Sequence, residues 1–430
     1  MPPVVMRDYR ATHTLTLGGR TLSDGPCDVH LDDTFLLVKG KGTTRIGYEQ
    51  LEAIRQVGRS VEVEIHPEGR LNLAATDGAL ARPMFLHLSR LRGARWVDLL
   101  RFVDGDAQDT LECKLSLNGG PEQEALFHVY PGSVVGIPLG GEVFQLPLHE
   151  LHTISLADYR LTCATPETTA VLFGCEPTDL ERFHRSVAGA RRKIEEDTAN
   201  LLMEVFPALE FAELTKLAAL LLRGKAAPKR TLDSIAPWFW GRAEDVIRTS
   251  PKASESYAYL RDRAGERLWF GIRRLTEAEK MGQGGEGEEA PPEPVEGEEP
   301  PPAETSELER PYLFWLIAGL GSGEKRRLAV EVVAGTSGFA TYVYRCPGAW
   351  NDAMSFADTA NAVSRAMVAL NFYREPLYAP EKEIETGRFG EYKLAVRKLP
   401  YLRAARERFV GRAAHTTKAA WASRMEKLLA

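Results

Sequence analysis

The sequence predicts an α+β protein: two small antiparallel β-barrels, each closed by a C-terminal helix, a helical connector, and a C-terminal antiparallel sheet with helices. Three observations predict this class. The pattern of residues 15–19 returns at residues 115–119, short runs alternate apolar and polar residues, and longer runs repeat apolar residues at helical spacing. Short strands separated by turn residues are typical of small antiparallel barrels or sandwiches.

The repeat keeps a constant shift of 100 residues far beyond its first positions. The corresponding apolar and glycine positions are Gly40 and Gly140, Ile46 and Leu146, Leu51 and Leu151, and Ile54 and Ile154. We therefore predict that one β-module is used twice, over residues 10–105 and 106–195.

The strands of the first module are clearest where Val61, Val63 and Ile65 alternate with glutamates. This period of two indicates one buried and one solvated face. Residues 84–88 read as a further strand, in an additional segment over residues 76–90 that the second module lacks. A closing helix follows, with its apolar face at Trp96, Leu99, Leu100 and Val103.

The second module has the same order of strands and helix. Its strands are predicted over residues 111–117, 125–130, 134–138, 143–148, 151–156, 159–164 and 170–174. The closing helix starts near Pro177, and its apolar face holds Leu180, Phe183, Val187, Ala190 and Ile194. We expect each closing helix to bury this face against one open end of its barrel.

About seven short strands and one closing helix with a large aromatic residue, Trp96 or Phe183, make up each module. This pattern resembles the pleckstrin-homology-like (PH-like) fold, as a tandem pair over residues 10–195. The resemblance implies binding and scaffolding, with peptides, partner proteins or lipid headgroups as ligands, and such tandem pairs also occur in histone-chaperone subunits. Two antiparallel β-domains of another barrel type are the alternative.

A lipid headgroup would require several basic side chains near the first loops of a module. The first module offers Arg20, Lys39, Lys41 and Arg45, whereas the second has only Lys114 across its first strands. Lys39 and Lys41 alternate along a strand end, as on an ordinary solvated surface. We therefore expect protein partners and no membrane lipid.

The chain has 430 residues and a net charge of −6, which argues neither for nor against a nucleic-acid partner. We find no apolar run of the roughly 20 residues that a membrane helix needs, and residues 1–3 do not begin a signal peptide. The five cysteines are odd in number and scattered, so we expect reduced thiols in the cytoplasm.

Residues 196–250 are apolar at helical spacing, and we predict a helical connector that Pro207 divides into two helices. A further helix over residues 229–247 carries Trp238, Phe239 and Trp240. Three consecutive aromatic residues on a helix point in different directions, so some must meet a second surface, either another domain or a partner. They are the first candidate binding residues.

The C-terminal domain, residues 251–430, contains an acidic Pro/Glu/Gly-rich segment over residues 277–309, with twelve acidic residues and one Lys. This composition predicts disorder. Strand patterns over residues 267–274 and 312–318 flank the segment, so we expect a long loop between two strands of one sheet. The following strands, and a helix over residues 356–370, fit either a third, diverged copy of the module or a generic α+β domain.

The tail, residues 387–430, is basic, with eleven Lys and Arg against three Glu. We predict a helical tail whose candidate binding residues are Arg397, Lys398, Arg403, Arg406, Arg408 and Arg412. One interpretation is a solvated helical face, and another is a patch for a nucleic-acid backbone or an acidic partner. In a third, the acidic segment screens the tail electrostatically.

Residues 149–152 come nearest to a metal motif, with His149 and His152 around one glutamate. The spacing is one residue shorter than in the zinc motif, and on the predicted strand the two histidines would point to opposite faces. The glycine-rich residues 319–325 lack the ending of a phosphate loop and precede a strand. We therefore expect no metal, no cofactor and no catalytic residue.

These observations favour a non-enzymatic cytoplasmic scaffold that binds protein partners through tandem PH-like modules. The alternative is a nucleic-acid or chromatin-associated factor that acts through the basic tail. An enzyme with a site between domains would need a cluster of titratable residues that the sequence does not display.

Overall fold

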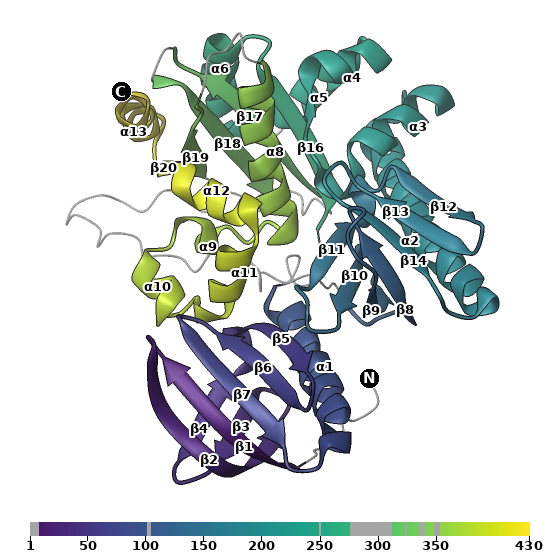
Figure 1. Cartoon of the computed structure of the whole chain (residues 1–430). Helices are drawn as coiled ribbons and strands as arrows, with labels where there is room; N and C mark the ends of the chain where they lie inside the picture. Colours follow the sequence, from purple (N-terminus) through teal and green to yellow (C-terminus); the bar gives the residue numbers. More distant parts are fainter. Residues whose placement is uncertain are drawn as a thin grey trace. The chain divides into compact units, whose positions relative to one another are not determined.

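The computed structural model describes residues 8–100, 105–248, 251–275, 312–322, 325–334, 340–347 and 353–430. The chain divides into two compact units, residues 1–193 and 194–430 (Figure 1). Unit 1 contains two seven-stranded antiparallel sheets, and unit 2 contains a six-stranded antiparallel sheet with helices. The protein is therefore α+β.

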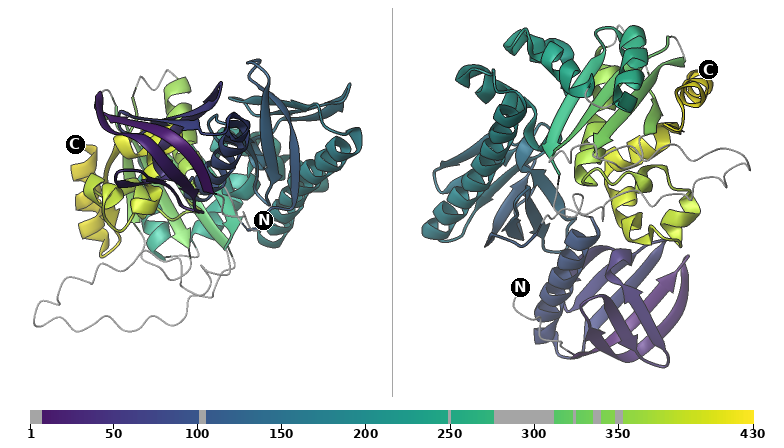
Figure 2. Two further views of the ribbon diagram at one scale, coloured as in Figure 1. Left: turned by 60° about the horizontal axis from the view of Figure 1, so that its bottom comes forward. Right: turned by 180° about the vertical axis from the view of Figure 1, so that it is seen from behind.

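The first sheet of unit 1 has the strand order β4-β3-β2-β1-β7-β6-β5. Its strands are β1 Asp8–Leu17, β2 Arg20–Leu31, β3 Phe35–Lys39, β4 Thr43–Gly47, β5 Leu51–Val57, β6 Ser60–Ile65 and β7 Gly69–Ala75. Val61 and Val63 on β6 are fully buried, as their alternation with glutamates predicts. Helix α1, Ala81–Leu99, follows and packs along β5 and β6 (Figure 2).

The second sheet repeats this order as β11-β10-β9-β8-β14-β13-β12. Its strands are β8 Asp109–Leu117, β9 Gln123–Val129, β10 Ser133–Pro138, β11 Phe144–Pro147, β12 Thr153–Ala157, β13 Arg160–Ala164 and β14 Thr169–Phe173. Short helices precede the fifth strand in both modules, η1 Tyr48–Gln50 and η3 Leu148–Glu150. The sequence repeat is thus a repeat of whole strands and of their order.

Helix α2, Pro177–Val205, closes the second module. The face predicted for it is buried, as Leu180, Phe183 and Val187 show. The Phe183 ring lies 6.4 Å from the Phe127 ring on β9, centroid to centroid. The apolar periodicity therefore identifies the inward face of this helix correctly.

The strand predicted over residues 84–88 is wrong, because these residues belong to α1. Met84 and Leu88 are fully buried and lie four residues apart, on the inward face of the helix. A short apolar run can form either element, and here the sheet that α1 covers decides. The additional segment predicted over residues 76–90 is therefore mostly the first half of α1, after the short helix η2 Gly78–Leu80.

Unit 2 begins within α2 and continues through helices α3 Phe211–Leu220, α4 Lys229–Ile235, α5 Phe239–Arg248 and α6 Pro251–Ala264. Helix α2 ends shortly before Pro207, where the sequence predicts a break. The single helix predicted over residues 229–247 is wrong. Pro237 divides it into α4 and α5, because a proline disfavours helical backbone at the preceding residue, and Ala236 is extended.

The sheet of unit 2 follows chain order, β15-β16-β17-β18-β19-β20. Its strands are β15 Ala227–Pro228, β16 Leu268–Arg274, β17 Tyr312–Leu320, β18 Arg327–Ala334, β19 Ala340–Arg345 and β20 Phe409–Ala414. Arg274 on β16 lies opposite Tyr312 on β17, which confirms the prediction of a loop between two strands of one sheet. The disorder predicted for residues 277–309 falls outside the described residues.

The helices after β19 are α8 Ala353–Ala369, α9 Glu375–Tyr378, α10 Glu381–Glu385, α11 Lys393–Lys398, α12 Pro400–Arg408 and α13 Lys418–Leu429. The predicted helical tail thus also contains a strand, β20, at the edge of the sheet. In both modules of unit 1 the first strand pairs with the last, whereas the sheet of unit 2 follows chain order. This difference favours a generic α+β domain over a third copy of the module.

Across the part of the chain that the structure describes, no helix is both long enough and apolar enough to cross a membrane.

Candidate functional site

The three consecutive aromatic residues lie at the start of α5, and two of them are buried in the core of unit 2. Phe239 is 0% and Trp240 4% exposed, and Trp238 is partly buried. The Phe239 ring lies 4.8 Å from the Phe206 ring and 6.0 Å from the Phe270 ring, centroid to centroid. Phe239 therefore packs between Phe206, directly after α2, and Phe270 on β16 of the same unit.

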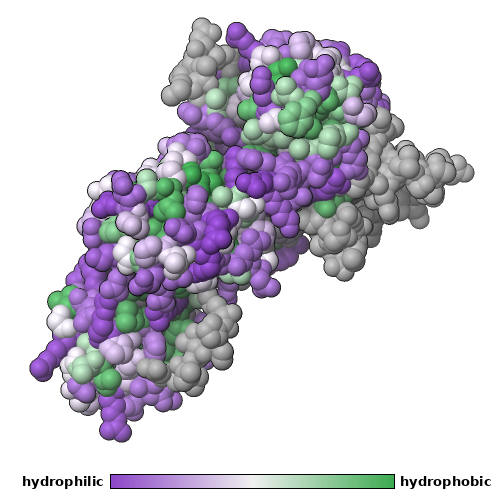
Figure 3. All heavy atoms as spheres, turned by 90° about the vertical axis from the view of Figure 1, so that its right-hand side faces the viewer, coloured by the Kyte–Doolittle hydropathy of each residue, from purple (hydrophilic) through white to green (hydrophobic). Residues whose placement is uncertain are grey.

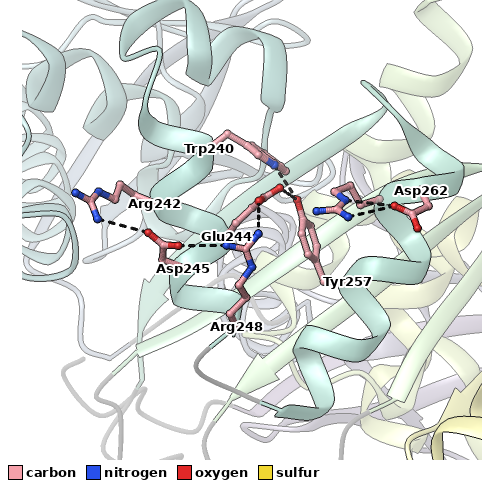
Figure 4. A network of polar contacts seen from close by, with 8 residues as sticks. Trp240, Arg242, Glu244, Asp245, Arg248, Tyr257 and Asp262 are labelled. Carbon is pink, nitrogen blue, oxygen red and sulfur yellow. Dashed lines mark hydrogen bonds and ion pairs between the residues drawn. The ribbon is translucent and has the colours of Figure 1, made fainter.

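Trp240 also belongs to a polar network between α5 and α6 (Figure 4). Its indole N–H donates to the Tyr257 hydroxyl at 2.9 Å, and that hydroxyl donates to Glu244 Oε1 at 2.6 Å. Arg248 Nη2 lies 2.9 Å from the other oxygen of Glu244. Burial, and then the nearby Glu244, raise the pKa of Tyr257 well above its usual range, so the phenol keeps the proton that it donates. The network fastens α6 to α5.

The six basic candidates in the tail are spread over several elements. Arg397 and Lys398 end α11, and Arg412 lies on β20. On α12, Arg403 is exposed, and it is the one exposed member of the set. The half-buried members are Arg397, Lys398, Arg406, Arg408 and Arg412. The sequence pattern therefore overstates how much of this charge faces solvent.

Three of the half-buried arginines donate to groups within unit 2. Arg406 donates to the carbonyl oxygens of Pro376 and Ala379, and its Nη2 lies 3.0 Å from Glu381 Oε2. These bonds join α12 to α9, to α10 and to the turn between them.

The other two arginines have side-chain partners. Arg408 Nη1 donates to Thr359 Oγ1 on α8 at 3.1 Å, and Arg412 Nη1 to the Tyr378 hydroxyl at 3.4 Å. The Arg412 guanidinium also lies 5.1 Å from the centre of the Tyr378 ring. These arginines therefore hold α12 and β20 to their neighbours.

A buried polar cluster of Glu331, Thr341, His415 and Trp421 lies on the sheet of unit 2, and no sequence motif points to it. Glu331 on β18 and Thr341 on β19 are both 0% exposed. His415 Nε2 lies 2.7 Å from Glu331 Oε1, and the Thr341 hydroxyl donates to the other carboxylate oxygen. The Trp421 indole N–H donates to Thr341 Oγ1 at 2.8 Å.

This cluster ties α13 and the end of β20 to the middle of the sheet. The His415 ring also stacks on Trp421, with centroids 5.1 Å apart. A lone glutamate inside the apolar β18 is the signal that could have identified it, because a buried carboxylate requires partners.

The histidines of residues 149–152 do not lie on a strand, so that prediction is wrong. His149 is in η3, with Nε2 3.7 Å from Glu150 Oε1, and His152 is exposed just before β12. The same short helix precedes β5 in the first module, so the repeated fold decides the local structure here. Within the described residues, no group of three or more His, Cys, Asp or Glu side chains is placed to hold a metal ion.

The two modules of unit 1 meet at β5, an edge strand of the first. The Ile54 N–H donates to the Gly140 carbonyl at 3.3 Å. Arg92 on α1 is 0% exposed, and it donates to the carbonyl oxygens of Glu52, at 3.2 Å, and Gly141. Burial lowers the pKa of Arg92 to about 10, so the guanidinium is charged at neutral pH. The first module thus binds carbonyl groups in a loop of the second, through the Ile54 amide and the Arg92 side chain.

Two glycines allow the close approach at this junction. A Cβ at Gly93 would lie 2.2 Å from Ile137 Cγ2, and a Cβ at Gly140 would lie 2.2 Å from the Ile54 carbonyl oxygen. Gly140 also has a φ of +76°, which favours glycine. The junction is therefore tightly packed.

The corresponding edge strand of the second module is β12, and among the described residues no strand lies beyond it (Figure 1). Its residues Ile154 and Leu156 are half-buried, and Ser155 is exposed. By the shift of 100 residues, Leu156 corresponds to Gln56 of β5. The second module therefore presents an apolar side chain where the first has an amide.

Other large apolar side chains are exposed at scattered positions. They are Leu17, Leu22, Val57, Leu80, Tyr159, Met203 and Phe211. Figure 3 shows one face of the molecule, on which apolar side chains form separate patches among hydrophilic ones. Scattered exposure of this kind is usual for a protein surface and does not by itself mark a binding site.

A comparison with known protein-family models finds none that matches this chain. A comparison with curated proteins likewise finds no match.

Proposed function

We propose that the chain is a non-enzymatic scaffold whose tandem PH-like modules bind protein partners. The observation that carries the proposal is the junction of unit 1, where an edge strand and a closing helix of one module bind carbonyl groups of the other. Such an edge is a general site for polypeptide, because main-chain hydrogen bonds do not depend on the sequence of the ligand.

The proposal treats each module as a small barrel of the PH-like kind. The strand order supports it, since β1 lies between β2 and β7, and β8 lies between β9 and β14. A single helix after the last strand of each module, α1 or α2, adds to this support. Because the sheet of unit 2 has a different order, the binding role is assigned to unit 1.

The environment of the basic residues in unit 1 favours protein partners over lipid headgroups. The Arg45 guanidinium lies 3.9 Å from the centre of the Phe35 ring. Lys114 Nζ lies 3.6 Å from Glu122 Oε2. Both basic side chains already contact other residues of the chain, which would compete with a phosphate group. We therefore do not assign a lipid-headgroup site to unit 1.

The proposed location is the cytoplasm. All five cysteines are free, and burial raises the pKa of the Cys113 and Cys163 thiols to about 12. Protonated, buried thiols are inert and suit a reducing compartment.

Affinity capture with the tagged full chain tests the proposed function. Proteins that remain bound after nuclease treatment, and that are recovered equally with Arg403→Glu, would support a protein-binding scaffold. Arg403 is chosen because it is exposed, whereas removing residues 387–430 would also remove β20 and α13 from unit 2.

Retention on heparin or DNA at low salt that Arg403→Glu abolishes would overturn the proposal in favour of a nucleic-acid-binding factor. Arg185→Glu is the matched control, since Arg185 is also exposed and the change in charge is the same. Binding to vesicles of anionic lipid, with no protein partner, would overturn it in favour of a membrane-binding module.

A further inference from the structure

The three sheets formed by the described residues have six edge strands, and five of these carry a feature that disfavours pairing with another chain. Charged residues and prolines are the usual protection of edge strands. In this protein the protecting residues are Arg45 on β4, Glu52 and Arg55 on β5, Pro147 on β11, Pro228 on β15 and Arg412 on β20. Among the described strands, β12 is the one edge strand with neither a charge nor a proline.

The side chains of β12 are sorted between its two faces. Ile154 lies opposite Cys163 on β13, and Leu156 lies opposite Leu161. Both partners are fully buried, so Ile154 and Leu156 point to the core side of the sheet. They are only half-buried themselves, and among the described strands none follows on their outer side. Another strand at this edge would complete their burial.

The corresponding strand β5 shows how such an edge is completed within this chain. There Ile54 is 1% exposed, and its N–H donates to the Gly140 carbonyl. The Arg92 guanidinium covers the same edge. Ile154 has the same place in the second module, but without a corresponding cover in the described part of unit 1.

We propose that β12 pairs antiparallel with β12 of a second copy of this chain, so that the two seven-stranded sheets join across a two-fold axis. This inference rests on the proposed function and names one partner of the scaffold. With the axis at Ser155, Ile154 of one copy lies opposite Leu156 of the other, on the core side of both sheets. Thr153 lies opposite Ala157 on the outer side.

The strand is complementary to itself, which is the reason to choose a second copy as the occupant. Apolar residues meet apolar residues on one face, and small or hydroxyl-bearing residues meet on the other. Because β12 is uncharged, two copies of it can pair without electrostatic repulsion. A contact about a two-fold axis uses the same edge of both copies, so the assembly ends at a dimer. Because the paired segment is short, we expect a weak dimer, with a Kd on the order of 10 µM.

Sedimentation of the full chain over a range of concentrations tests the pairing. Wild type is expected to change from monomer to dimer as concentration rises. Ser155→Lys places two like charges face to face at the axis, at a position that is exposed in the single chain, and should raise the dimer Kd at least about tenfold. Leu156→Gln, which introduces the residue found at position 56 of the first module, should also raise the dimer Kd.

Val57→Lys is the matched control, because Val57 ends β5 as Ala157 ends β12 and is 53% exposed. It should leave the dimer Kd unchanged. A wild type that stays monomeric at 1 mM, roughly a hundred times the expected Kd, would overturn the pairing. The pairing would also be overturned if the Ser155→Lys variant dimerises as strongly as wild type and has the same melting temperature as wild type.

The two proposals fail separately. A monomeric wild type that still captures other proteins would sink the self-pairing and leave the scaffold proposal standing. A wild type that dimerises but captures no other protein would support the self-pairing and contradict the scaffold proposal.

Discussion

The two modules of unit 1 share a strand order, yet their fifth strands have opposite surroundings. In the first module, β5 carries Glu52 and Arg55 and is covered by the loop at Gly140. In the second, β12 is uncharged and has no strand beyond it among the described residues. A repeated fold thus keeps its core and diverges at its edges, because main-chain groups at an edge must be covered, protected or paired.

The cover of β5 depends most on Arg92. Replacing Arg92 by Leu removes the guanidinium that donates to the carbonyl groups of Glu52 and Gly141, and we expect unit 1 to lose about 3 kcal/mol of unfolding free energy. Urea denaturation measures the loss, and hydrogen exchange at the Ile54 amide should show that it begins at β5. Arg90→Leu is the control, since Arg90 is exposed and pairs with Glu112 at the surface. Equal stability of the two variants would contradict the assigned role of Arg92.

The modules should also differ in their response to alkali. Burial raises the pKa of Cys163 from 9.0 to about 12, and its counterpart in the first module is Val63, which has no thiol. Above pH 9 the thiol ionises in the unfolded chain but not in the folded one, so stability is full below pH 9 and is lost as pH rises towards 12. The loss from this thiol is about 2 kcal/mol at pH 10.5.

Cys163→Val introduces the residue that the first module has at this position. It removes the loss of unfolding free energy that ionisation of the Cys163 thiol causes at high pH. Unfolding free energies measured at pH 8 and pH 10.5 should show a smaller loss in the variant than in wild type. Identical losses would mean that the Cys163 thiol ionises equally in the folded and unfolded states.

The close approach at Gly140 gives an effect smaller than that of Arg92. Gly140→Ala forces a Cβ against the Ile54 carbonyl at a φ of +76°, and we expect a loss of about 2 kcal/mol. Gly119→Ala is the control, because Gly119 has a φ of +73° and open space around it, so only the backbone term of about 1 kcal/mol remains. Thermal unfolding that is the same for both variants would mean that the loop at Gly140 can move away from β5.

The sequence pattern predicts the strands and their repetition, because alternation and turn residues are local signals. It also predicts the inward face of α2 through Phe183 and Val187, which are buried as expected. It fails at residues 84–88, where a short apolar run carries too little periodicity to separate strand from helix, and tertiary packing decides.

The polar contacts are a harder case, because they depend on which residues the fold brings together. No sequence motif points to Arg92, yet it is 0% exposed and donates to carbonyl groups that are far away in sequence. Arg406 and Arg408 read as a basic patch, yet they are half-buried and bonded within unit 2. The open edge at β12 is equally hidden, because its sequence is visible but its place at the end of a sheet follows from the strand order.

The smallest expected effect is the most informative about why the two edges differ. Gln56→Leu gives β5 the apolar residue of β12 at an exposed position, so its stability should stay within about 0.5 kcal/mol of wild type. If the cover by Gly140 and Arg92 closes this edge, the substitution should create no new pairing, and in a Ser155→Lys background the chain should sediment as a monomer. If Gln56→Leu restores a dimer in that background, the polar residue at position 56, and not the cover, keeps the first module from pairing.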